Sequence, residues 1–144
     1  MKKLLIVASL VFAFCCGATI AIGFAQSRDT QGYLIERDRE VARDEPGTHG
    51  GGGPSTGYLF FEKAPNLKFS FRKRVLHKGA AIGYHLQQTD EVYYITGGDG
   101  LMTVNGQSFA VKAGDAVLTR SGSSHGLVQK GDADLTIIIT FQKE

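Results

Sequence analysis

The stretch GAAIGYHLQQTDEVYYITGG, residues 79–98, places His85, Gln87 and Glu91 within seven residues. Residues two apart on a strand project from the same face, so His85 and Gln87 are expected to point together. Gln88-Thr89-Asp90 is polar and compatible with a turn, and Glu91 then begins the next strand-like run. We expect an antiparallel neighbour to bring His85 and Glu91 across from each other. The stretch therefore predicts half of a metal site.

Residues 114–125 supply the other half of the predicted site. A Gly-Asp turn and a short apolar strand lead into the small-residue loop RSGSSH, which ends at His125. His125 begins a further strand, so its side chain is expected to point inward. Two histidines and one carboxylate suit Fe(II), Mn(II), Ni(II) or Zn(II), with coordination positions left open for a substrate. The alternative for His85 and His125 is that both are hydrogen-bonded histidines inside a barrel.

The pattern from Tyr58 onward is typical of β-strands. Apolar and polar residues alternate over residues 67–75, which predicts a strand with Leu67, Phe69, Phe71 and Val75 on its buried face. Asn105-Gly106 between two apolar runs predicts a hairpin. Eight or more short strands at this spacing, without a convincing helix, indicate an all-β sandwich or barrel.

The first 25 residues have the features of a signal peptide. Lys2 and Lys3 precede an uncharged run of 22 residues that ends in Gly23-Phe24-Ala25, which fits cleavage after Ala25. We expect a periplasmic or secreted protein that is free of the membrane once the leader is cleaved. The alternative is an uncleaved membrane anchor, because 22 uncharged residues are long enough to span a bilayer.

Removal of this leader changes both the charge and the cysteine content. Fourteen basic residues then remain against fourteen acidic ones, so nothing in the net charge indicates a nucleic-acid partner. Both cysteines, Cys15 and Cys16, lie in the leader, so we expect a fold without disulfide bonds.

Residues 26–57 read as a charged arm followed by a Gly-rich linker, ahead of a barrel over residues 58–144. The arm is interpreted as solvated, with packing on a second subunit as the alternative. His49 lies inside the run PGTHGGGGPSTG. It is interpreted as a solvated loop histidine; the alternative is a lid that reaches over a pocket.

The spacing of both motifs resembles that of the cupins. Their first motif, G-x5-H-x-H-x3,4-E-x6-G, is followed with one departure, Gln87 for the second histidine. Their second, G-x5-P-x-G-x2-H-x3-N, is followed with two departures, Arg120 for the proline and Gln129 for the asparagine. The matching positions are Gly79, His85, Gln87, Glu91 and Gly98, then Gly114, Arg120, Gly122, His125 and Gln129. The resemblance implies a double-stranded β-helix (jelly-roll) barrel, often dimeric, with a divalent metal inside.

The departure at Gln87 leaves several roles open. Its amide is interpreted as a weak fourth ligand or as a partner of a metal-bound water, and the alternatives are a substrate contact or a metal-free pocket. Tyr93 shares a face with Glu91, so both are candidate catalytic residues; plain core packing is the alternative for Tyr93. Arg120 is expected either to meet an anionic substrate or to form an ion pair at the barrel rim.

Three functions are compatible with this sequence. The leading one is a metal-dependent enzyme of dioxygenase, isomerase or lyase type that acts on a small polar metabolite. The second is a non-catalytic module that binds a sugar-like ligand in the same barrel. The third is a structural role with a degenerate site.

Overall fold

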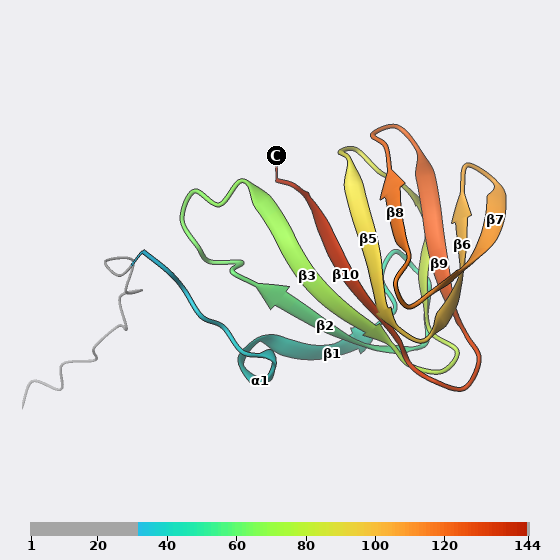
Figure 1. Cartoon of the computed structure of the whole chain (residues 1–144), viewed down its shortest axis with the longest axis horizontal. Helices are drawn as coiled ribbons and strands as arrows, with labels where there is room; N and C mark the ends of the chain where they lie inside the picture. The colour runs from blue at the N-terminus through green and yellow to red at the C-terminus, as the bar shows by residue number, and fades with distance from the viewer. Residues whose placement is uncertain (1–31, 144) are drawn as a thin grey trace, which may run out of the picture. The chain divides into compact units, whose positions relative to one another are not determined.

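The computed structural model describes residues 32–143, which fold into two antiparallel sheets. The elements are α1 (Asp38–Val41), β1 (Ala42–Pro46), β2 (Pro54–Phe60), β3 (Phe69–Leu76), β4 (Ala81–Leu86), β5 (Glu91–Gly97), β6 (Asp99–Val104), β7 (Gln107–Lys112), β8 (Ala116–Thr119), β9 (Ser124–Lys130) and β10 (Leu135–Gln142). The six-stranded sheet has the order β1-β2-β3-β10-β5-β8, and the four-stranded sheet has the order β4-β9-β6-β7 (Figure 1). The predicted jelly-roll architecture is confirmed.

The two sheets pack face to face over one apolar core. On β5, Tyr93 and Ile95 are buried on the same face as Glu91, while Tyr94 points outward and is exposed. On β10, Ile137 is buried on the matching face. The core consists of Leu76, Ala80, Ile82, Tyr93, Ile95, Met102, Val111, Leu127, Leu135, Ile137 and Ile139. Alternation along the strands therefore sets which side chains meet inside the barrel.

The predicted hairpin at Asn105-Gly106 is present. It joins β6 to β7, with Val104 opposite Gln107. Asn105 and Gly106 have φ values of 47° and 79°. Positive φ at both central residues is what the tight two-residue turn requires, and Asn-Gly is the pair that adopts it most readily.

The prediction for β3 was wrong about its buried face. Ser70 and Arg74 are buried, and Phe69 is 48% exposed, so the polar residues point inward. Arg74 Nη2 lies 2.6 Å from Glu45 Oε1, and its Nη1 donates to Ser55 Oγ at 2.9 Å. These partners come from β1 and β2, which the prediction did not place beside β3. The burial of Arg74 is therefore decided by a neighbour distant in the sequence.

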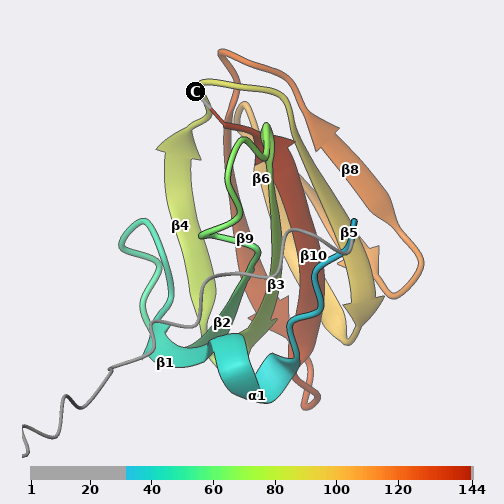
Figure 2. The same ribbon diagram turned by 90° about the vertical axis from the view of Figure 1, so that its left-hand side faces the viewer.

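The predicted arm and linker are also ordered over their described part. Instead of an irregular segment up to residue 57, β1 pairs with β2 and β2 pairs with β3. The connection between β1 and β2, residues 47–53, hydrogen-bonds to β4 through Ala81 N to Gly52 O and Gly83 N to Thr48 O. Figure 2 shows this connection rising beside β4. It thereby covers the open edge of the four-stranded sheet.

The predicted signal peptide, residues 1–25, lies outside the described residues. Within residues 32–143, no helix has the length and apolar character needed to cross a membrane.

Candidate metal centre

The two histidines of the motifs are direct partners in one sheet. His85 of β4 lies opposite His125 of β9, and their ring centroids are 4.5 Å apart. Glu91 belongs to β5, in the other sheet, where its partners are Phe141 and Thr119. The prediction that His85 and Glu91 are neighbours on paired strands was therefore wrong. The Gln87–Asp90 connection crosses from one sheet to the other, so the carboxylate faces the imidazoles across the barrel.

The three side chains nevertheless converge on one point inside the barrel. Their nearest ligand atoms all lie within 4.8 Å of one another. Glu91 Oε2 is 3.0 Å from His125 Nε2, and the two side chains are 7% and 0% exposed. Charge buried to this depth is costly unless it is paired or coordinates a metal.

The hydrogen bonding of this group is incomplete. Among the described residues, Glu91 Oε2 and His125 Nδ1 are buried without a hydrogen-bond partner. Native proteins leave few buried polar atoms unsatisfied, and a missing ion is one of the recognised reasons. Two imidazole nitrogens and a carboxylate oxygen form a donor set that binds divalent first-row metals. The residues present therefore fit the transition metal that the sequence predicts.

The orientation of the His85 ring is fixed by a hydrogen bond to the backbone of its own strand. Its Nδ1 lies 2.8 Å from the carbonyl oxygen of Gly83. A carbonyl only accepts, so Nδ1 is the donor of this hydrogen bond, and in the neutral imidazole the lone pair then lies on Nε2. This is the arrangement seen behind many metal-binding histidines, where an outer hydrogen bond sets the tautomer.

Tyr93 combines the two roles that the sequence left open. It is a core residue, 3% exposed, and its hydroxyl lies 3.1 Å from His125 Nε2. Burial, joined by the negative charge of Glu91, raises the pKa of the Tyr93 phenol well above its usual range; the positive charges of Arg74 and Arg72 oppose the shift. Tyr93 is therefore a protonated donor beside the candidate ligands.

The other motif residues have structural partners. Gln87 Nε2 lies 3.4 Å from Thr89 Oγ1, so its amide is drawn towards its own loop. Arg120 is paired with Asp90 at the rim, with 3.1 Å between Nε and Oδ1, and its side chain is 72% exposed. Of the two roles predicted for Arg120, the structure shows the ion pair.

Gln129 holds the ends of the barrel strands together. It is buried, its Oε1 accepts from Gly79 N at 3.0 Å, and its amide donates to the carbonyl oxygens of Lys130, Gly131 and Ala133. This links the first glycine of the first motif to the turn before β10. A glutamine at the asparagine position thus serves the fold.

His49 was not among the predicted site residues. Its ring is exposed, as the solvated interpretation required, but it stacks on His85 with the centroids 3.5 Å apart and the planes 3° from parallel. Partial burial and the nearby His85 lower the pKa of His49. The Glu91 carboxylate opposes this lowering, and His125 contributes to it. The sequence signal was a histidine within a glycine run, whose approach to β4 only the fold reveals.

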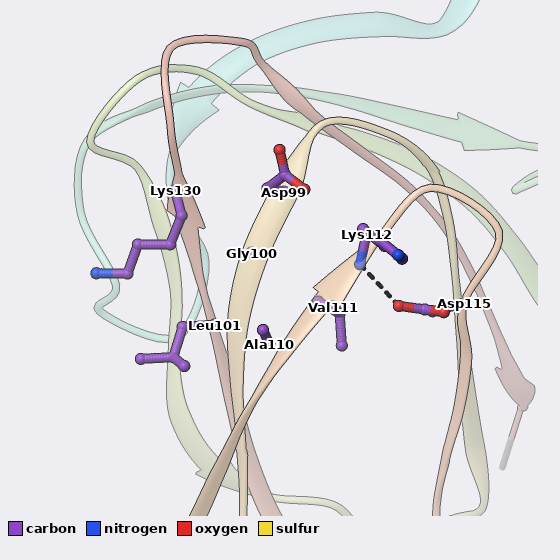
Figure 3. Close-up of a pocket in the computed structure, with 8 residues that line it drawn as sticks. All are labelled: Asp99, Gly100, Leu101, Ala110, Val111, Lys112, Asp115 and Lys130. Carbon is purple, nitrogen blue, oxygen red and sulfur yellow. Dashed lines mark hydrogen bonds between the residues drawn. The ribbon is translucent and has the colours of Figure 1, made fainter.

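One hollow of the structure lies apart from this group. It is lined by residues of β6 and β7 together with Asp115 and Lys130, and Lys112 N donates to Asp115 Oδ2 at 2.8 Å (Figure 3). None of the three candidate ligands lines it.

A two-sheet jelly-roll barrel that encloses two histidines and a glutamate defines a class of small β-barrel proteins with a candidate metal site inside the barrel. A family model described as "Cupin domain" matches residues 73–141. The fold, both motifs and this match place the chain in one family. The chain belongs to the cupin superfamily.

Relatives and solved structures agree with this assignment. The chain is similar to an oxalate-binding protein of Thermotoga maritima, with 36% identity over 69 residues, 47% of this chain and 57% of that protein. An uncharacterized protein of Methanocaldococcus jannaschii is 32% identical over 73 residues, 50% of this chain and 58% of that protein. The matches thus span less than three fifths of the length of these curated relatives.

Solved structures match over a larger share of their length. A predicted oxalate decarboxylase of Thermotoga maritima superposes with a TM-score of 0.68 and 28% identity, covering 77% of this chain and 100% of that one. An RmlC-like cupin of Shewanella frigidimarina, with a TM-score of 0.60 and 22% identity, covers 78% of this chain and 92% of that one. The second likeness supports the fold alone.

Proposed function

We propose that this cupin binds a small carboxylate-bearing molecule at a divalent transition metal held by His85, Glu91 and His125. The observation that carries the proposal is the convergence of these three groups within 4.8 Å in the barrel interior. The incomplete hydrogen bonding of the group supports it: Glu91 Oε2 lies 3.0 Å from His125 Nε2 but makes no hydrogen bond within the described part of the chain, and a bound cation would complete its contacts.

Each residue has a defined part in such a site. His85, His125 and Glu91 would hold the metal, which when bound would supply Lewis-acid polarisation of a substrate oxygen. Gly83 O holds the His85 ring in the required tautomer. Tyr93 keeps its proton and offers it to a neighbouring acceptor. The surrounding apolar core excludes bulk water, which strengthens each of these electrostatic contacts.

One cationic side chain on the inward face, Arg72, supports an anionic ligand. Arg72 lies on the inward face of β3, opposite Ile139, which in turn is opposite Tyr93 on β5. Its Nε donates to Ser70 Oγ at 2.9 Å, and its guanidinium lies 4.9 Å from the centre of the Phe141 ring. Neither partner carries a charge, so the guanidinium keeps its capacity to pair with a carboxylate. A relative that binds oxalate agrees with this choice of ligand class.

Turnover of the bound carboxylate is the second candidate function. The solved relative described as a predicted oxalate decarboxylase favours the lyase type among the reactions expected from the sequence. In that reaction the carbon–carbon bond of hydrogen oxalate breaks, carbon dioxide leaves, and the proton ends on the carbon of formate. We propose Tyr93 and Glu91 as the residues that carry that proton, because the Tyr93 hydroxyl and a Glu91 oxygen each lie about 3 Å from His125 Nε2.

Metal binding is tested first. Protein purified without a histidine tag and loaded with Mn(II), Co(II) or Zn(II) is expected to hold about one equivalent by elemental analysis. The variants His85→Ala and Glu91→Ala should lose the metal. The control variant His77→Ala should retain it, because His77 contacts Thr56 and Asp134 and is not a candidate ligand. Less than a tenth of an equivalent in the reloaded parent would refute the proposal.

Ligand binding is tested on the metal-loaded protein. Calorimetric titration with oxalate should give saturable binding, and Arg72→Gln should weaken it about tenfold or more, because a charge-assisted contact is lost. Equal binding of a neutral sugar would instead favour the sugar-like module. Formate production from oxalate separates catalysis from binding alone.

We also propose that the protein is exported, on the basis of its leader-like first 25 residues. Proteolysis of intact and of osmotically shocked cells, each followed with an antibody, tests this location. Dimerisation stays a prediction, which sedimentation measures directly.

A further inference from the structure

The candidate metal group contains two imidazoles, and the position that would offer a third holds Gln87 instead. Gln87 follows the end of β4, its backbone is bound to the loop before β9, and its amide is drawn towards Thr89. An amide oxygen is also a weaker ligand than an imidazole for most first-row metals. The site is therefore short of one nitrogen donor.

The connection of residues 47–53 brings a further histidine beside the candidate metal group. His49 stacks on His85, the outermost of the three candidate ligands. The connection is pressed closely against β4: a Cβ at Gly83 would lie 2.0 Å from His49 O, and one at Gly51 would lie 2.1 Å from Ala81 O. Only glycines permit this approach, and they hold the backbone of His49 beside the metal group.

The backbone of His49 itself is strained. Its φ is 53°, in the left-handed region that glycine adopts more readily than histidine, while glycines occupy positions 47 and 50–53 of the same connection. Unfavourable conformations of this kind persist where the surrounding structure imposes them, and they gather at functional sites. A ring that served only as a solvated side chain would need neither this strain nor the stack on His85.

We propose that His49 is a third imidazole ligand of the metal, supplied by the glycine-rich connection in place of the histidine that Gln87 replaces. The exposed ring turns about its side-chain bonds, out of the stack on His85, while the backbone stays anchored to β4. The metal site then contains three nitrogens and one carboxylate oxygen. This inference rests on the proposed metal site of His85, Glu91 and His125.

Pulsed EPR of the protein loaded with Cu(II) alone tests the assignment, because remote imidazole nitrogens modulate the signal in proportion to the number of bound rings. We expect three imidazoles in the parent and two in His49→Ala, with a Cu(II) Kd raised about tenfold or more. His49→Asn should also bind Cu(II) through two imidazoles. Asparagine tolerates the positive φ at this position, so this variant gives the result even if the alanine variant folds poorly. His77→Ala is the matched control and should keep three.

The substitution Gln87→His provides the sharpest arm of the experiment. In the His49→Asn background it should restore three imidazoles and the parental Kd, because it returns the missing ring to its motif position. Two imidazoles in the parent, or an unchanged Kd and ring count in His49→Asn, would overturn the role of His49 and leave the proposed metal site standing. A parent that binds no Cu(II) would overturn both.

Discussion

Replacement of Gly83 by alanine tests whether the connection of residues 47–53 is docked on β4. The added Cβ would lie 2.0 Å from His49 O, and ordinary contact begins at about 3.4 Å, so the backbone must separate by roughly 1.4 Å. That displacement removes the hydrogen bonds from Gly83 N to Thr48 O and from Ala81 N to Gly52 O. Each contributes about 0.5 to 1.5 kcal/mol, and the stack of His49 on His85 about as much again. We expect the free energy of unfolding to fall by roughly 1.5 to 4.5 kcal/mol.

Urea denaturation followed by circular dichroism measures this change, with Gly97→Ala as the matched control. A Cβ at Gly97 meets nothing closer than 3.9 Å, and its φ is not positive, so that variant should match the parent or gain about 0.4 to 1 kcal/mol through a less flexible unfolded chain. Gly83→Ala should also weaken Cu(II) binding if His49 is a ligand. An unfolding free energy of Gly83→Ala within about 0.5 kcal/mol of the parent would refute the close docking of the connection.

Three further predictions concern the barrel interior. Saturating Mn(II) at a hundred times its Kd should raise the unfolding free energy of the parent by about 2.7 kcal/mol, and a chelator should remove the gain; a similar gain in Glu91→Gln would contradict the assigned ligand. Glu45→Ala should cost about 1 to 3 kcal/mol in urea denaturation, because it removes the carboxylate partner of the buried Arg74; an unchanged midpoint would show that the pair is not stabilising. Because its pKa is raised in the folded protein, Tyr93 favours folding fully below the ordinary tyrosine pKa of about 10, and this contribution is lost as the pH rises above it. Absorbance at 295 nm should show the Tyr93 phenol ionising only on alkaline unfolding, a phase absent from Tyr93→Phe; ionisation before unfolding would contradict this.

Local patterns in the sequence predicted an all-β sandwich or barrel and three members of the candidate site, and the resemblance of both motifs to the cupins implied the jelly-roll form. Strand alternation placed Tyr93 and Ile95 on the face of Glu91, and Asn105-Gly106 marked the hairpin through its backbone preference. The spacing of the two motifs brought His85 and His125 together, since each lies at a fixed position on its own strand.

The tertiary structure decided which residues face the barrel interior from distant parts of the chain. Arg74 points inward because β1 and β2 bring Glu45 and Ser55 to it, an outcome that alternation along β3 alone could not predict. Glu91 meets the histidines across the barrel and not along a shared ladder, because the chain changes sheets after β4. β4 is an edge strand of the four-stranded sheet, and the glycine-rich connection lies close enough to hydrogen-bond along it. His49 is thereby brought into its stack on His85. Local spacing therefore determined the ligands within each motif, and long-range packing determined what surrounds them.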